Sequence, residues 1–144
     1  SLPMAQRTGD EGKVFAVDIQ PEMLAIIEQK AEAESIENVE RVLATAENPN
    51  LPAESIDLAL FGDAYHQCEW PREIMTAIRN SLVPGGKVVL IEYRMEDPMV
   101  PIKILHKMSE QQARQELEAV GLKFVSNGDF LPQQHFLVFE KPAL

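Results

Sequence analysis

Apolar and polar residues divide the chain into two alternating kinds of segment. Short, mostly apolar runs, typical of strands buried in a sheet, occupy residues 13–17, 39–44, 56–61, 87–93, 122–126 and 136–140. Segments with apolar residues at helical spacing occupy residues 2–7, 21–34, 71–83 and 109–120. This order predicts an α/β doubly wound fold, mostly parallel, with an antiparallel pair of strands at the C-terminal end.

Local signals mark where these elements begin and end. Pro21 is well placed at a first helical position, and Ser109 with Gln112 has the spacing of a capping box. The "PGG" at residues 84–86 is expected to end the helix before it, and Gly121 the last helix. The "RMEDPMVPIK" stretch reads as a loop. No repeat or linker is evident, so we expect one domain over residues 1–144.

Charge and cysteine content narrow the classes of partner. The formal net charge is -10, and a nucleic-acid binder would need a basic face, so no nucleic-acid partner is expected. No apolar run approaches the roughly 20 residues of a membrane span. The single cysteine, Cys68, excludes an internal disulfide and a multi-cysteine zinc site. The default expectation is a cytoplasmic protein that acts on a small molecule.

The stretch "KVFAVDIQPEML" places a carboxylate, Asp18, where a buried strand ends and a helix begins. Ligands of doubly wound sheets bind beyond the carboxyl ends of the strands, and an acid in this position commonly accepts hydrogen bonds from ribose hydroxyls. The alternative is that Asp18 only caps the helix that starts at Pro21. Position alone leaves both readings open.

An ordered set of segments resembles one family, the class I (Rossmann-like) S-adenosylmethionine-dependent methyltransferases. The matching segments are "GKVFAVDIQPEML", "ATAENPNLP", "SIDLALFGDAYHQ" and "LVPGGKVVLIEY", followed by a closing pair, "KFVSNGDF" and "HFLVFEKP". The branch that looks nearest comprises the small-molecule methyltransferases related to ubiquinone and menaquinone biosynthesis. The resemblance implies methyl transfer from S-adenosylmethionine to a small-molecule acceptor.

The resemblance also implies roles for residues in the cofactor site. Asp18 would bind the ribose hydroxyls, and Ile19 would pack on the adenine. Thr45, Ala46 and Glu47 would line the adenine edge, although the family usually has an aspartate where Thr45 stands. The methionine part of the cofactor would lie over the segment Gly62, Asp63 and Ala64.

The family's glycine-rich turn and the strand that leads into it have no counterpart in the sequence, and both should precede Ser1. We therefore expect an N-terminally incomplete domain in which the first strand is missing. The strands at Lys13 and Ile56 would flank that gap, and unpaired apolar strand edges favour self-association.

Residues that could act on the acceptor follow or precede strands at the same sheet edge. They are Tyr65, His66, Tyr93, His106 and His135, which include all three histidines of the chain. His66, directly after the third strand, is the expected general base. No metal is expected, because the histidines and Cys68 lack the spacing of a ligand set.

Two other functions remain open. A nicotinamide-dependent oxidoreductase would also place an acid near a ribose, but "DIQPEML" and "LVPGGKVVL" favour the methyltransferase. The third reading is a degenerate Rossmann-like module that binds without catalysis. Such a module would fail to bind S-adenosylmethionine even as a full-length protein.

Overall fold

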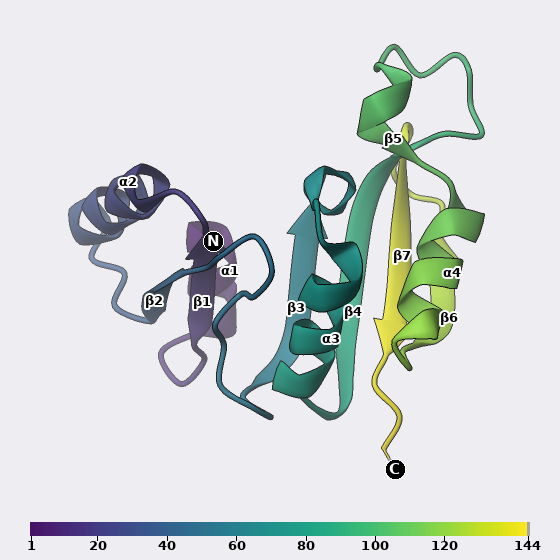
Figure 1. Cartoon of the computed structure of the whole chain (residues 1–144). Coiled ribbons are helices and arrows are strands. Elements are labelled where there is room, and N and C mark those ends of the chain that lie inside the picture. Colours follow the sequence, from purple (N-terminus) through teal and green to yellow (C-terminus); the bar gives the residue numbers. More distant parts are fainter. Residues whose placement is uncertain (144) are drawn as a thin grey trace. The chain divides into compact units, whose positions relative to one another are not determined.

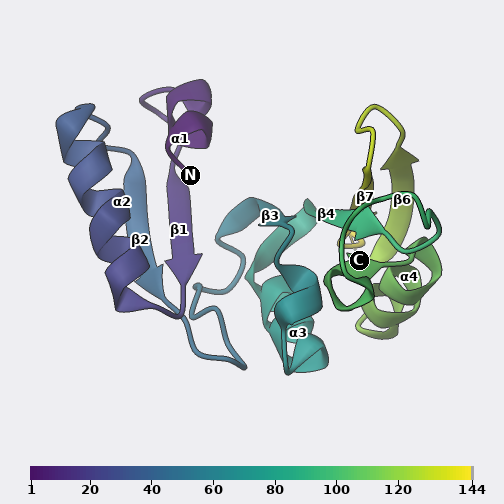
Figure 2. The same cartoon turned by 90° about the horizontal axis from the view of Figure 1, so that it is seen from above.

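The computed structural model describes residues 1–143, which form two compact units that divide between Asn50 and Leu51. Figure 1 shows the elements of both units in chain order, and Figure 2 shows them from above. Whether both belong to one domain, as the sequence predicts, stays a prediction.

The first unit pairs two parallel strands with two helices. Its elements are α1 (Leu2–Thr8), β1 (Val14–Asp18), α2 (Pro21–Ala33) and β2 (Val39–Leu43). β1 and β2 pair in register from Val14 opposite Val39. Pro21 is at the start of α2, as predicted, and Gly9 with φ 75° ends α1. The Asn38 amide ties α1 to the strands, because its Nδ2 donates to the carbonyls of Ala5, Gly9 and Gly12.

The second unit is built on a mixed sheet in the order β3-β4-β7-β6, with β5 paired to β4. Its elements are β3 (Ile56–Gly62), the 3₁₀ turn η1 (Tyr65–Gln67), α3 (Pro71–Ser81), β4 (Leu82–Arg94), the 3₁₀ turn η2 (Ile104–His106), β5 (Lys107–Met108), α4 (Glu110–Ala119), β6 (Lys123–Gly128) and β7 (Gln134–Glu140). β3 runs parallel to β4, and β7 runs antiparallel to β4 and β6.

The core of the second unit lies between the sheet and the helices α3 and α4, which cover the same sheet face in Figures 1 and 2. Alternate residues of β4, Val88, Leu90 and Glu92, have no exposed surface. Their inward direction follows from the two-residue period of a strand. They are joined in the core by Leu137 and Phe139 of β7. The polar member of this inward row, Glu92, sits at the carboxyl end of β4.

The fold class predicted from the sequence is confirmed, with three local differences. α3 ends at Ser81, before the "PGG" segment, and β4 begins at Leu82 and includes it. The pairing partner advances from Leu82 to Lys87 while β3 advances from Ile56 to Leu58, so the segment distorts the ladder of β4.

The other two differences concern the segments around α4. The predicted loop after β4 contains η2 and β5. At the start of α4, the Ser109 hydroxyl accepts from the Gln112 backbone N–H at 3.0 Å, which confirms the N-cap. The Gln112 side chain bonds Glu116 instead of returning to Ser109, so the capping box is only half formed.

Candidate functional site

Glu92, His66 and His106 form a hydrogen-bonded chain at the carboxyl edge of the second unit's sheet. Oε2 of Glu92 lies 2.7 Å from Nδ1 of His66, and Nε2 of His66 lies 3.3 Å from Nδ1 of His106. Oε1 of Glu92 accepts the backbone N–H of His66 at 3.0 Å. The carboxylate therefore fixes both the backbone and the ring of the predicted base.

Tyr65, the residue before His66, is buried and contacts groups of the protein on two sides. Its side chain packs edge-on against Phe61, and its hydroxyl donates to Oε1 of Glu116 on α4 at 2.8 Å. Burial raises the pKa of Tyr65, and the carboxylate of Glu116 raises it further. The phenol therefore stays neutral and is already committed to an acceptor within the protein.

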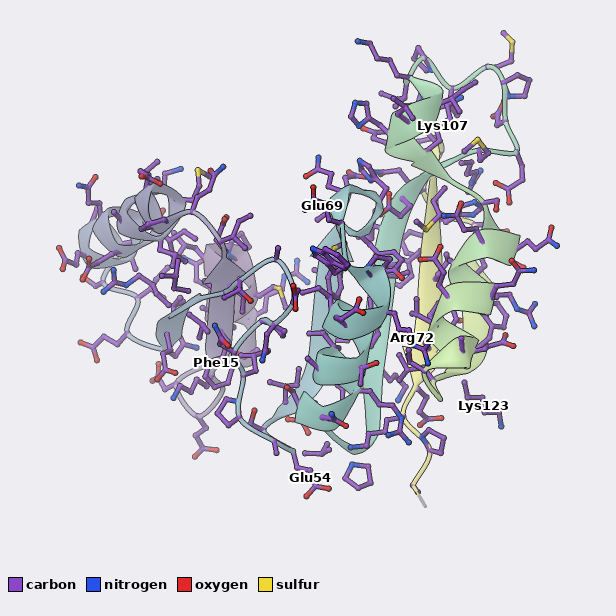
Figure 3. The ribbon with its side chains drawn as sticks, viewed as in Figure 1. Phe15, Glu54, Glu69, Arg72, Lys107 and Lys123 are labelled. Atoms are coloured by element: carbon purple, nitrogen blue, oxygen red, sulfur yellow. The ribbon has the colours of Figure 1, made fainter. Side chains whose placement is uncertain are left out.

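Tyr65 and His66 border a cleft of about 470 Å³ between η1, α3 and α4. Its other lining residues are Cys68, Pro71, Arg72, Met108, Gln112, Gln115, Glu116 and Ala119. Figure 3 shows the Arg72 side chain on the side of α3 that faces α4. Burial raises the pKa of the Cys68 thiol, and the carboxylates of Glu92 and Glu116 raise it further, so the thiol is neutral.

His135 lies on the first part of β7, opposite Glu92 in the strand register, but its contacts are different. Its Nε2 lies 2.9 Å from Oε1 of Glu96, and Asn127 donates to its Nδ1 at 3.0 Å. Burial raises the pKa of Glu96, but hydrogen bonds from backbone N–H groups and from His135 outweigh it, so the net pKa is lowered. His135 thus bridges β6 to the segment after β4.

Tyr93 and His135 do not line the cleft that Tyr65 and His66 border, and His106 reaches it through His66. Tyr93 is partly exposed at the end of β4, where its backbone pairs with Gln134 and Lys107. Figure 3 labels Lys107, the β5 residue that pairs with Tyr93. The sequence thus places all five residues at one edge, and the structure brings three of them together.

The predicted cofactor residues of the second unit follow β3 directly. Asp63 has φ 52°, a left-handed backbone, and Nε2 of Gln134 contacts its two carboxylate oxygens at 2.8 and 2.6 Å. Gly62 and Ala64 on either side of it are exposed. The segment is therefore an open turn fixed by a side chain from β7.

The predicted cofactor residues of the first unit follow β1 and β2. Oδ1 of Asp18 accepts the backbone N–H of Gln20 at 2.9 Å, which is the local turn expected of a helix-start carboxylate. The neighbouring Ile19 is 57% exposed. The Thr45 hydroxyl accepts the backbone N–H of Asn48 at 3.1 Å, and Ala46 and Glu47 are exposed within this turn.

These residues fit the ribose and adenine of a nucleoside cofactor. In the described part of the chain, only Oδ1 of Asp18 has a hydrogen-bond partner, which leaves Oδ2 free to accept from hydroxyls. An exposed isoleucine beside it offers an apolar surface for a flat base. Thr45 fits less well as a polar contact, because its hydroxyl is already engaged in its own turn.

Sequence reasoning missed four residues that hold the predicted ones: Glu92, Glu96, Glu116 and Gln134. Glu92 carried a readable signal, since it shares the inward parity of Val88 and Leu90 within an apolar run. Residues 1–143 contain no group of three or more histidine, cysteine or acidic side chains placed to hold a metal ion. No helix among these residues is both long and apolar enough to span a membrane.

In each of the two units, polar residues follow the carboxyl ends of the parallel strands, as is typical of α/β proteins. A family model described as "Methyltransferase domain" matches residues 1–90, so the chain belongs to this family. The resemblance stated from the sequence is therefore confirmed.

Curated relatives match the first part of the chain. The demethylmenaquinone methyltransferase of Geobacillus sp. (strain WCH70) is 26% identical over 92 residues, which are 64% of this chain and 39% of the relative. The aklanonic acid methyltransferase DauC of Streptomyces sp. (strain C5) is 33% identical over 59 residues, 41% of this chain and 27% of the relative. The chain thus spans well under half the length of the curated relatives it matches.

Solved structures share the fold at low identity. A SAM-dependent methyltransferase from Aquifex aeolicus has a TM-score of 0.88 at 20% identity and covers 96% of this chain and 74% of its own. The [4+2]-cyclase SpnF has a TM-score of 0.83 at 14% identity and covers 99% of this chain and 70% of its own. Since the second protein is called a cyclase, these likenesses concern the fold alone.

Proposed function

We propose that the chain is part of an S-adenosylmethionine-dependent methyltransferase that acts on a small-molecule acceptor. The match of the methyltransferase family over residues 1–90 carries this proposal. The relatives named for demethylmenaquinone and aklanonic acid support a small organic acceptor. A net charge of -10 argues against a nucleic-acid substrate. A cytoplasmic setting stays a prediction from the sequence.

In this proposal the cofactor supplies an electrophilic methyl group on a sulfonium, and the protein supplies binding and alignment. Oδ2 of Asp18 accepts from the ribose hydroxyls while Oδ1 keeps the Gln20 turn. Ile19 packs on the adenine, and the turn from Thr45 through Ala46 to Glu47 borders its edge. The segment of Gly62, Asp63 and Ala64 supports the methionine part.

The residues proposed to act on the acceptor are in the second unit. His66 and His106 stand together at the sheet edge, with the neutral Tyr65 beside His66. The cleft that Tyr65 and His66 border adjoins this pair but is not lined by His106. Tyr93 and His135 belong to the same sheet edge but not to that cleft, so we assign them to its surroundings. Proton removal from the acceptor falls to the histidine pair.

Cofactor binding tests the proposal without knowledge of the acceptor. Titration calorimetry on a full-length version of the protein should show binding of both S-adenosylmethionine and S-adenosylhomocysteine, with NAD as a negative control. Binding of NAD alone would restore the oxidoreductase. Binding of none of the three would favour the non-catalytic module, because a shared fold does not by itself imply methyl transfer.

Transfer itself is then tested with demethylmenaquinone, the acceptor that the relatives' names print. Methylated product detected by mass spectrometry would identify the reaction. Once an acceptor that the protein methylates is known, H66Q should lower kcat by roughly 10²–10⁴. Cofactor affinity should be unchanged, as expected when only proton removal is impaired. A parallel loss of cofactor affinity would place His66 outside the proton-transfer step.

A further inference from the structure

The hydrogen bonds of Glu92 determine which nitrogen of His66 carries the proton. Glu92 is fully buried, and both its oxygens are taken by one residue, the backbone N–H and Nδ1 of His66. A carboxylate can only accept hydrogen bonds, so Nδ1 of His66 must carry a proton. In the neutral ring the lone pair is then on Nε2.

The same argument continues to His106. Nε2 of His66 lies 3.3 Å from Nδ1 of His106, and the two rings meet edge to face with centroids 5.4 Å apart. Since Nε2 of neutral His66 accepts, Nδ1 of His106 must donate, and the lone pair of His106 is left on its own Nε2. The His66 side chain is only 7% exposed, whereas His106 is exposed. In this hydrogen-bonded series, the nitrogen whose lone pair is free to take a proton is therefore Nε2 of His106, the exposed ring.

We propose that Nε2 of His106 is the base that takes the acceptor's proton, and that His66 and Glu92 are positioning residues behind it. The inference rests on the proposed function and revises the sequence-based choice of His66. In the step, the acceptor's O–H or N–H bond breaks, its electron pair stays on the acceptor, and the proton forms a bond to Nε2 of His106. The positive charge that results is spread to His66 and matched by the buried carboxylate of Glu92.

Glu92 is the carboxylate that balances a positive charge on the His66–His106 pair, because the other groups near the pair are neutral or hydrogen-bonded elsewhere. Tyr65 and Cys68 line the same cleft and are both neutral, because their pKa values are raised by burial and by nearby carboxylates. Glu116 is occupied by the Tyr65 hydroxyl and the Gln112 amide. The neighbouring Lys107 ammonium is turned to the carbonyl of Asp97.

Nitrogen NMR of the wild-type chain with ¹⁵N-labelled histidine tests the proton positions directly. His66 and His106 should both be Nδ1–H tautomers when neutral. His135 is an internal control with the opposite tautomer, since Asn127 donates to its Nδ1 and its Nε2 faces Glu96. The three histidines are assigned by single glutamine variants. An Nε2–H tautomer at either His66 or His106 would overturn the proposal.

Chemical modification tests which nitrogen is reactive and whether Glu92 matters. Diethyl pyrocarbonate, the probe, should acylate His106 first and His66 and His135 slowly, as followed by peptide mass spectrometry. E92Q should slow modification of His106 several-fold, because the outer ring loses its buried counter-charge. The matched control is E118Q, which removes an exposed carboxylate paired to Arg114 on α4 and should leave the rate unchanged. An equal rate in E92Q and E118Q would reject Glu92 as a positioning residue.

The two proposals fail separately. Loss of cofactor binding in a full-length version of the protein would refute the methyltransferase function and leave the tautomers and reactivity standing. Conversely, normal cofactor binding with the wrong tautomers would refute the histidine chain alone. Where turnover can be measured, H106Q should lower kcat by roughly 10²–10⁴ with cofactor affinity unchanged. Wild-type kcat in H106Q would also refute the role of His106.

Discussion

The two carboxylate oxygens of Asp63 accept from the single amide nitrogen of Gln134, at 2.8 and 2.6 Å. The contact spans 71 positions of the chain and joins the turn after β3 to the first residue of β7. Asp63 has a left-handed backbone, which costs free energy for a residue with a side chain. We infer that Gln134 holds this turn in the conformation that the proposed cofactor site requires.

Q134A should therefore lower the free energy of unfolding by about 1.5 kcal/mol, the low end for a hydrogen bond to a charged group. It should also weaken S-adenosylmethionine binding, because the Asp63 turn is released. Urea unfolding and calorimetry measure the two effects. The control is Q133A, since Gln133 is exposed and, among residues 1–143, takes part in hydrogen bonding only through its backbone carbonyl, which accepts from the Arg94 N–H. Equal behaviour of the two variants would exclude a role for the Gln134 amide.

Asp18 combines a turn contact with a proposed ligand contact, and two variants can separate them. D18N keeps an oxygen for the Gln20 N–H but loses the charge, whereas D18A loses both. Each should weaken S-adenosylmethionine binding by ~1.5–3 kcal/mol, roughly ten- to a hundredfold. Only D18A should also lower stability. Unchanged affinity in a folded D18N protein would reduce Asp18 to a helix-start residue.

Tyr65 should make the protein sensitive to alkali. Its folded pKa is raised, so its contribution to stability is fully present below the unfolded value of about 10 and is lost as the pH rises above it. Above about pH 10 the free energy of unfolding should fall by up to about 1.4 kcal/mol per pH unit from this group. Urea unfolding between pH 8 and about pH 11 measures it.

The comparison for this prediction is Y65F, which removes the ionisable group and keeps the ring. Y65F loses the hydrogen bond to Glu116, so it should be less stable than the wild type at neutral pH. The difference between the two proteins should shrink as the pH rises above about 10. A difference that stays constant would show that Tyr65 ionises equally in both states.

The outer edge of β3 should promote self-association. β3 is the terminal strand of its sheet and carries two exposed leucines, Leu58 and Leu60. A lysine on an edge strand opposes pairing with another chain, so L60K should shift sedimentation toward the monomer. M99K, at an exposed site outside the sheet, is the control. A wild-type chain that sediments as one monomeric species and melts cooperatively would contradict this prediction.

The strands and helices were predictable because each is short, regular and bounded by strong local signals. Apolar runs such as residues 13–17 and 56–61 recur as β1 and β3 within one residue of their ends, and Ser109 caps α4 as its spacing indicates. The "PGG" segment was misjudged because a helix ending and a strand irregularity use the same residues. In the structure, pairing with β3 decides between them.

The site was only partly predictable, because its contacts depend on register between distant strands. The sheet edge that collects the histidines follows from strand direction, so their convergence could be stated in advance. The partner of each could not: His135 contacts Glu96, 39 residues earlier, whereas His66 contacts Glu92, 26 residues later. Only the inward parity of Glu92 could have revealed its role from sequence.

The division of the chain between Asn50 and Leu51 has a consequence for how such a protein can change over generations. Asp18 is encoded before the boundary, and the whole chain of Glu92, His66 and His106 is encoded after it. One crossover in the intervening loop would exchange the nucleoside-facing acid together with its strands and leave the proton-handling residues uninterrupted. Such an exchange would keep the hydrogen bonds that join Glu92, His66 and His106 within one inherited segment.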